Sequence, residues 1–307
     1  RYSLSYCFLL LHFGEIKQKM TLLVKAVIKF LHFIPYSLLH KFGSLMALFL
    51  NLLPNSHKKI TQQNLKLVFP DKSSKDIKTL IKKSLFHSSM NFLESGIVWG
   101  SKNTKFENYL VEVFNKEAIN KSFDSDRGIL LITPHLGNIE IIIKFLGKRF
   151  NCTIPYSKPN QSYLDKIITL SRESAGVKMV HPDSAGLKVL IKSLKEKNMV
   201  AIASDQVPKQ GFGIASTFFG KEIYSMTLVP KLKKVSNCAV HSVYCERRKK
   251  AQGFNIYFSD ELDLSHDVQE GVDRMNNEFE ECIMTIPEQY SWEYKKFKRS
   301  VNKTIYN

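Results

Sequence analysis

The sequence lacks several patterns that mark whole classes of protein. Its 307 residues contain no CxxC pair, no G-x-G-x-x-G and no G-x-S-x-G. These absences argue against a structural zinc site, a dinucleotide site and a serine hydrolase with a nucleophile elbow. The cysteines cannot all pair with one another, so we expect a reducing compartment and a cytoplasmic position for the folded part. They are Cys7, Cys152, Cys238, Cys245 and Cys282.

Acidic residues are scarce relative to basic ones. Lys and Arg total 45 against 28 Asp and Glu, which gives a formal net charge of +17. The expected partners are therefore anionic: nucleic acid, phospholipid headgroups or an acidic carrier protein. The lysines are spread over many segments without a nucleic-acid-binding motif, so we expect no nucleic-acid partner. Lys greatly outnumbers Arg, which suits diffuse attraction to acidic membranes and offers fewer bidentate phosphate ligands.

The amino-terminal region has no uninterrupted apolar run of the roughly 18 residues that a spanning helix needs. Lys25, Lys29 and Lys41 are among the polar residues that interrupt the apolar segments of 20–54. A tilted span over 36–53, an interfacial pair of amphipathic helices and a buried pair of core helices are all compatible with this pattern. A cleaved signal peptide fits least well, because no small-residue cleavage site follows.

The chain divides into three predicted parts. Residues 1–19 precede Met20, which begins a natural-looking start, and are interpreted as an upstream or mis-called extension. Residues 20–54 are expected to form a membrane-associated helix or helices. Residues 55–307 comprise a helical arm and an α/β core, and no repeat, low-complexity segment or linker divides that core.

Short apolar segments alternate with helical segments in the second half of the chain. The predicted strands cover 127–133, 150–155, 177–182, 198–204, 239–246 and 253–259. Helical stretches separate the first four, and strand and helix alternation at this spacing indicates a largely parallel sheet with helices on both faces. The predicted fold class is α/β, with a largely parallel central sheet flanked by helices and an amino-terminal membrane-associated helical segment.

The segment LITPHLGNIE, residues 131–140, carries a candidate site. A predicted strand precedes the turn with His135, which places this residue at the carboxyl edge of the sheet, where open α/β folds bind ligands. If Asn138 caps the next helix, Glu140 lies in the first turn, and a bend at Gly137 lets the carboxylate accept a ring N–H. Such a pair suits general-base catalysis of acyl transfer. The spacing alone also fits a turn histidine beside an incidental surface glutamate.

Four blocks of the sequence, in order, resemble the bacterial lipid A biosynthesis acyltransferases, the late lauroyl and myristoyl transferases. ILLITPHLGNIE resembles their H-x4-D/E motif. ITQQNLKLVFPDKS (60–73) is similar to the segment after their membrane helix. ASDQVPKQGFGIASTFFGKEIYSMTLVPKLKK (203–234) resembles their Asp-Gln strand end, glycine-rich loop and Phe-Phe-Gly stretch, and PEQYSWEYKKFK (287–298) resembles their carboxyl-terminal block. The resemblance runs from about Met20 to Arg299 and implies a glycerolipid-acyltransferase-like fold.

The resemblance also implies a mechanism. His135 would act as the general base on an acceptor hydroxyl, Glu140 would orient the ring, and the hydroxyl would attack the thioester of an acyl carrier without an acyl-enzyme. Backbone N–H groups of Gly137 and Asn138 are candidates to stabilise the developing oxyanion. The expected co-substrate is an acyl thioester, and no cofactor and no metal are expected.

Four more residues are candidates for substrate binding. Arg172 matches an arginine that precedes a strand in the family, and is either a bidentate phosphate ligand or an exposed helix residue. Lys158, in YSKPN, is a second phosphate candidate. Asp205 and Gln206 follow a strand at the same sheet edge as His135, where they contact polar headgroup atoms, order the next loop or form an ordinary turn.

Two aromatic residues and one histidine have two interpretations each. Phe218 and Phe219, with Gly220, either line an acyl channel or, as aromatic residues near a sheet, belong to the core. His241 stands in a strand where the relatives usually have a proline-containing sequence, and we expect it to be a packed strand residue and not a second base.

The resemblance therefore implies an O-acyltransferase of the bacterial inner membrane, with its catalytic domain on the cytoplasmic face. The expected donor is acyl carrier protein, which a basic surface favours, or a coenzyme A thioester. The expected acceptor is an anionic membrane glycolipid, a lipid A precursor. An acyltransferase of the same superfamily that acts on another glycolipid, an aminolipid or a glycerophosphate is the alternative. We expect a monomer.

Overall fold

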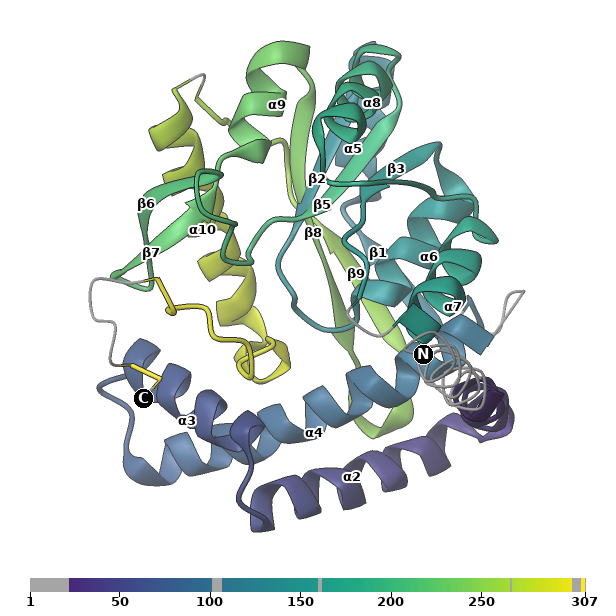
Figure 1. Cartoon of the computed structure of the whole chain (residues 1–307), viewed down its shortest axis with the longest axis vertical. Coiled ribbons are helices and arrows are strands. Elements are labelled where there is room, and N and C mark those ends of the chain that lie inside the picture. Colours follow the sequence, from purple (N-terminus) through teal and green to yellow (C-terminus); the bar gives the residue numbers. More distant parts are fainter. Residues whose placement is uncertain (1–21, 101–106, 160–161, 266, 300–304, 307) are drawn as a thin grey trace, which may run out of the picture.

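A seven-stranded sheet lies at the centre of the molecule, with helices on both faces (Figure 1). The strand order is β1-β9-β8-β2-β5-β3-β4, and its pairings are parallel except for β8 with β9. β6 and β7 form a separate antiparallel hairpin. The strands are β1 (Leu110–Phe114), β2 (Ile129–Thr133), β3 (Cys152–Pro155), β4 (Lys178–Val180), β5 (Met199–Ala203), β6 (Gly213–Phe218), β7 (Lys221–Met226), β8 (Ala239–Arg247) and β9 (Phe254–Phe258). The predicted α/β class with a mostly parallel sheet is confirmed.

The structure, a computed structural model, describes residues 22–100, 107–159, 162–265, 267–299 and 305–306. Residues 22–33 are helical, and the helices after them are α2 (Tyr36–Leu52), α3 (Ser56–Val68), α4 (Ser74–Gly100), α5 (Lys116–Asp124), α6 (Ile139–Arg149), α7 (Ser162–Glu173), α8 (Ser184–Lys195), α9 (Leu228–Ser236) and α10 (Val268–Thr285). Short 3₁₀ turns cover Glu107–Tyr109, Lys249–Ala251 and Pro287–Gln289. The interpretation of residues 1–19 falls outside the described residues, and the division into three parts stays a prediction.

The central strand β2 is buried on both sides. Leu130 and Ile132 pack into one core and Ile129 and Leu131 into a second core across the sheet. Successive side chains of a strand point to opposite faces, so a strand covered by helices on both faces needs an unbroken apolar run. The run ILLIT satisfies this requirement and fixes the position of the loop that follows β2.

The six predicted strands are all present, but the sequence prediction missed β1 and the β6–β7 hairpin. β1 lies at the sheet edge and exposes part of its length, and β6 alternates half-buried, exposed and buried residues. Neither forms the continuous apolar run by which the central strands were found. Tertiary pairing, and not local pattern, makes them strands.

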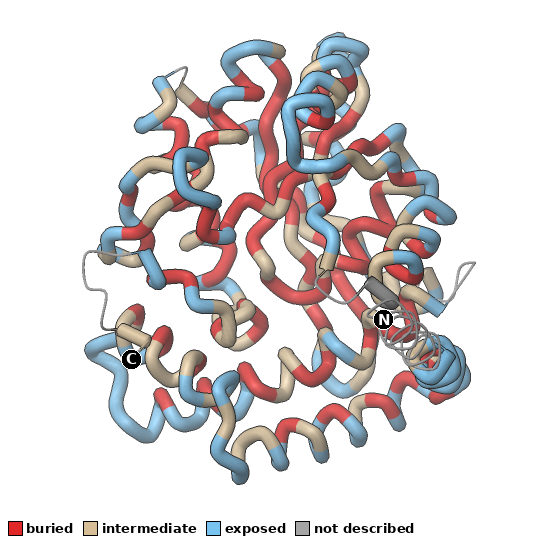
Figure 2. Tube along the Cα trace, in the orientation of Figure 1, coloured by how far each residue is buried: buried red, intermediate tan, exposed pale blue. Residues whose placement is uncertain are grey.

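Helix α2 presents a large apolar surface to solvent. It packs on α4 through buried residues that include Tyr36 and Leu39, while Phe42, Leu45 and Phe49 are exposed. Figure 2 shows that exposed residues recur along the length of this helix. Within the described ranges no single helix has both the length and the apolar character to cross a bilayer. The pair α2 and α3 has the length and composition together, with a bend of 81° between the two helices.

Candidate active site

The sheet brings His135 and Asp205 together. β2 and β5 are parallel neighbours, and their register pairs Thr133 with Ala203 at the carboxyl ends. His135 and Asp205 each follow two residues after these positions, so both chains leave the sheet side by side. This is the edge at which open α/β folds bind ligands.

Asp205 contacts His135 at two atoms. Its Oδ1 lies 2.6 Å from Nδ1 of the imidazole, and its Oδ2 accepts the backbone N–H of His135 at 2.9 Å. Burial alone would lower the pKa of His135, but the charge and hydrogen bond of Asp205 raise it. Although burial disfavours the charged carboxylate, the same pairing lowers the pKa of Asp205 to about 2. Asp205 is therefore an ionised partner that holds a proton on Nδ1.

Two residues from the carboxyl-terminal block complete the surroundings of this carboxylate. The hydroxyl of Tyr290 donates to Oδ2 of Asp205 at 3.1 Å. The ammonium of Lys296 donates to the backbone oxygen of Asp205 and lies 4.7 Å from the Phe218 ring centroid. Burial lowers the pKa of Lys296 to about 8 despite the opposing charge of Asp205. These contacts hold the carboxylate of Asp205 in place against Nδ1 of the imidazole.

The other ring nitrogen of His135 faces the accessible side of the site. Its side chain retains 29% exposure, whereas that of Asp205 retains 3%. Nε2 lies 3.2 Å from Nε2 of the exposed Gln206 side chain. With the proton on Nδ1, this geometry assigns a lone pair to Nε2 of His135, which accepts an amide N–H of Gln206. A substrate hydroxyl that replaces the amide would meet a base.

The expectation that Glu140 accepts a ring N–H of His135 is wrong in this structure. Glu140 forms a two-point ion pair with Arg172, at 2.6 Å from Oε1 to Nη2 and 3.3 Å from Oε2 to Nε. The predicted cap is present: the side chain of Asn138 accepts the N–H of Glu140, which lies in the first turn of α6. On a helix that starts at Ile139, the Glu140 side chain is directed to α7, which carries Arg172.

Arg172 is neither free nor fully exposed. Its guanidinium lies 5.2 Å from the Tyr156 ring centroid, and its side chain retains 14% exposure. The interpretation as an exposed helix arginine is therefore wrong. A role in binding phosphate stays a prediction. Lys158 is exposed beyond the carboxyl end of β3 and joins none of the hydrogen bonds described for this site.

The backbone of the His135 loop is tied to the carboxyl-terminal block. The N–H of Gly137 donates to the carbonyl of Gln289 at 3.0 Å, and the N–H of Ser291 donates to the carbonyl of His135 at 3.1 Å. Gly137 has a φ of +66° and approaches Cys245 of β8 closely. Because the N–H of Gly137 is already occupied, the expectation that it is free to stabilise an oxyanion is wrong in this structure. The corresponding role of the Asn138 N–H stays a prediction.

A buried ion pair supports the loop that carries His135. Glu94 of α4 pairs with Arg247 of β8, and both side chains are almost fully buried. Oε2 of Glu94 accepts from the Asn138 amide at 2.9 Å, and the Gln289 side chain bonds the backbone N–H and carbonyl of Arg247. The ion pair thus connects the start of α6, strand β8 and the carboxyl-terminal block.

Burial decides between the two interpretations that the sequence allowed for Phe218 and for His241. Phe218 is fully buried within one of the two cores. The ring of His241 is buried in β8, where Nε2 lies 2.7 Å from the hydroxyl of Ser122 and Nδ1 lies 3.0 Å from the carbonyl of Ser259. Burial lowers the pKa of His241, so it is a packed neutral residue, as expected.

The sequence interpretation missed five residues of this site. Gln289, Tyr290 and Lys296 lie within PEQYSWEYKKFK, a block noted for its resemblance but given no role. Glu94 and Arg247 lacked any local signal, because their pairing depends on α4 packing beside the end of β8.

Comparisons with known proteins identify the family of the chain. A model of the bacterial lipid A biosynthesis acyltransferase family matches residues 11–299. The chain is 25% identical over 275 residues to the lipid A biosynthesis lauroyltransferase of Escherichia coli, covering 86% of this chain and 87% of that protein. It is 21% identical over 267 residues to the palmitoleoyltransferase of the same organism, covering 86% of each, and 22% identical over 269 residues to a lipid A biosynthesis acyltransferase of Haemophilus influenzae, covering 85% and 82%. The chain belongs to the bacterial lipid A biosynthesis acyltransferase family, and it is an acyltransferase.

Proposed function

We propose that this protein transfers a fatty acyl chain from an acyl thioester, carried by acyl carrier protein, to a hydroxyl group of a lipid A precursor. The observation that supports this most directly is the His135–Asp205 pair, which leaves Nε2 of a partly exposed imidazole as a base at the carboxyl edge of the sheet. The family of the chain supplies the class of acceptor.

In the proposed reaction, Nε2 of His135 removes the proton of the acceptor hydroxyl as its oxygen attacks the thioester carbonyl. The new C–O bond forms, the C–S bond breaks, and the proton passes to the leaving thiolate. Asp205 keeps the proton on Nδ1 and stabilises the imidazolium that forms. The amide of Gln206, beside Nε2, is placed to contact the incoming acceptor.

Glu140 and Arg172 have a different role in this proposal. Their ion pair connects the first turn of α6 to the end of α7 and so keeps these two helix ends in place next to His135. The three N–H groups of Arg172 that do not contact Glu140 remain for a phosphate of the acceptor.

We further propose that the protein acts at the cytoplasmic face of the inner membrane. The exposed apolar side of α2 supports this, since a contiguous exposed apolar surface is usually covered by a partner or a membrane. The net charge of +17 supports attraction to anionic lipid and to an acidic carrier protein.

The test is transfer of a labelled acyl chain from acyl carrier protein to a tetraacylated lipid A precursor by membranes that contain the protein. His135→Ala should lower the rate about 10²- to 10⁴-fold, because one general base contributes that much. His181→Ala, which changes an exposed histidine on another loop, is the matched control and should leave the rate unchanged. Near-normal transfer by His135→Ala would reject the mechanism.

A further inference from the structure

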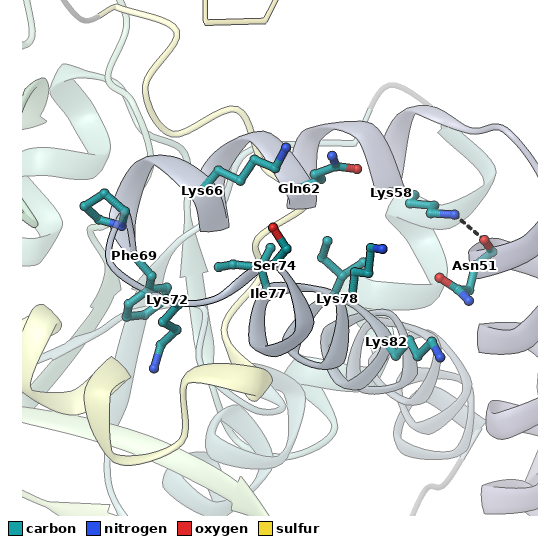
Figure 3. A pocket seen from close by; sticks show the side chains of 12 residues that line it. Asn51, Lys58, Gln62, Lys66, Phe69, Lys72, Ser74, Ile77, Lys78 and Lys82 are labelled. Carbon is teal, nitrogen blue, oxygen red and sulfur yellow. Dashed lines mark hydrogen bonds between the residues drawn. The ribbon is translucent and has the colours of Figure 1, made fainter.

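A concave site lies between α3 and α4, at the end of α2 (Figure 3). This cavity of about 680 Å³ has a size typical of small-ligand sites. None of its lining residues belongs to the site around His135. Five of them are lysines, and none is a carboxylate: Lys58, Lys66, Lys72, Lys78 and Lys82. We call this cavity the α3–α4 lysine pocket.

The positive charge of the pocket is not neutralised by the protein. Lys58 donates to the backbone oxygen of Asn51, and the other four lysines are exposed. In the described part of the chain no ion pair joins any of the five to a carboxylate. The first residue of α4, Ser74, also lines the pocket, so the positive end of a 27-residue helix adds to the field, although Asp76 in the same first turn offsets part of it. A bound anion would relieve this repulsion.

The floor of the pocket is apolar and separates it from the active site. Ile77 and Ile81 are buried, and Phe69 lies 5.9 Å from the ring of Trp292. Trp292 in turn lies 4.8 Å from the ring of Tyr290, whose hydroxyl bonds Asp205. The aromatic contacts of Phe69, Trp292 and Tyr290 therefore separate the lysine pocket from Asp205.

The position of the pocket favours a lipid headgroup. One wall is Asn51, in the last turn of α2, next to Leu52 and Leu53, which are 66% and 58% exposed. A bilayer that takes up the apolar side of α2 therefore brings its headgroup layer to the mouth of the pocket. A concave site of this volume suits a compact phosphate group, whereas an acidic carrier protein would present a broader convex surface.

We propose that the α3–α4 lysine pocket binds the phosphate headgroup of an anionic membrane phospholipid and thereby sets the orientation of the protein on the membrane. This inference rests on the membrane association proposed above. It concerns a lipid that is not consumed, at a site remote from the acyl-transfer residues.

The probe is dihexanoyl phosphatidylglycerol below its micelle concentration, titrated into the full chain in neutral detergent and followed by calorimetry. We expect saturable binding of one molecule per chain, at least about tenfold tighter than dihexanoyl phosphatidylcholine or inorganic phosphate. The quadruple variant Lys66→Gln, Lys72→Gln, Lys78→Gln and Lys82→Gln should lose about tenfold or more in affinity, since each lysine near an anionic headgroup contributes substantially.

Two control proteins separate a pocket from diffuse charge. The first, Lys178→Gln, Lys188→Gln, Lys192→Gln and Lys195→Gln, removes the same charge from exposed positions on β4 and α8 and should bind the probe within about threefold of the original chain. The second, Gln62→Trp, keeps every lysine but fills the space between α3 and α4, and should abolish saturable binding.

Three outcomes with the variants would each overturn the inference. Equal losses in the two quadruple variants would assign the effect to diffuse charge. Unchanged binding by Gln62→Trp would show that the pocket is not used. Loss of carrier-protein affinity in the pocket variant, with lipid binding intact, would identify the pocket as a protein-docking site. Acyl transfer measured in the same detergent keeps the proposals apart: wild-type transfer without saturable headgroup binding contradicts only this inference, and headgroup binding without transfer contradicts only the proposed reaction.

Discussion

Asp205 fixes His135 through both of its carboxylate oxygens, one on the imidazole Nδ1 and one on the backbone N–H of the same residue. A carboxylate that bonds ring and backbone together allows little rotation of the imidazole. The residues are 70 positions apart and meet because β2 and β5 are neighbours. The carboxylate five residues after His135, in contrast, is bound to Arg172.

The first prediction concerns the pH dependence of catalysis. The charge of Asp205 raises the pKa of His135, and the base is active only when deprotonated, so kcat/KM should rise with pH through that pKa. Asp205→Asn removes the charge. Its acid limb should move to lower pH, while its plateau falls by up to about 10⁴-fold because the tautomer is no longer fixed. A pH profile of transfer by the two proteins checks this, with Asp183→Asn as a control; an unmoved acid limb would contradict the assignment of Asp205.

The second prediction concerns the ion pair of Glu140 and Arg172. A double-mutant cycle with Glu140→Gln and Arg172→Lys should give a coupling of about 1–3 kcal/mol in unfolding free energy, because both side chains are mostly buried and lysine cannot form the two-point contact. The comparison pair Arg127 and Glu261 also makes two hydrogen bonds, at 2.7 and 2.6 Å, but at a more exposed position, and should give less than about 1 kcal/mol. Equal coupling energies for the two ion pairs would contradict the argument that burial strengthens the pair of Glu140 and Arg172.

If Arg172 also holds the acceptor, its substitution should do more than weaken the fold. Arg172→Lys should raise KM for the lipid acceptor about tenfold while leaving KM for the acyl donor within about twofold. Initial rates with each substrate varied in turn separate the two effects. Equal changes in the KM values for acceptor and donor would show that Arg172 only supports the structure around the site.

The fourth prediction concerns the buried ion pair behind the loop. Glu94→Gln leaves the charge of Arg247 uncompensated and weakens the contact with Asn138, so it should lower the unfolding free energy by about 3–5 kcal/mol. Glu196→Gln, which breaks an exposed pair with Lys192, is the control and should cost less than about 0.5 kcal/mol. Chemical denaturation of the three proteins gives the comparison, and a small loss for Glu94→Gln would reject the supporting role.

The last prediction uses two glycines with positive φ. A Cβ on Gly137 would collide with the carbonyl of Cys245, whereas a Cβ on Gly211 would meet nothing within 4 Å. Gly211→Ala should cost about 1–2 kcal/mol of backbone strain. Gly137→Ala should cost more and reduce transfer at least about 10²-fold, since it displaces the loop that carries His135. Thermal melts and transfer rates test both, and full activity of Gly137→Ala would contradict the described loop.

The sequence alone was sufficient to predict the local features of the fold around the site. The run ILLIT required a strand buried on both faces, Asn138 provided the cap of α6, and the turn between them put His135 at the sheet edge. Each depends on residues within one turn or one strand, where side-chain periodicity and capping chemistry act directly. The edge strand β1 and the β6–β7 hairpin lacked such a pattern and were missed.

The partners within the site were decided by tertiary structure. Whether His135 meets Glu140 or Asp205 depends on which strand lies beside β2 and in what register, and the spacing of residues along the chain does not encode strand order. The same reason applies to Glu94 and Arg247, which are 153 positions apart, and to Tyr290, which reaches Asp205 from the carboxyl-terminal block. The sequence thus determined the local elements around the site and the position of His135 at the sheet edge, while the packing of distant elements determined which carboxylate contacts the imidazole.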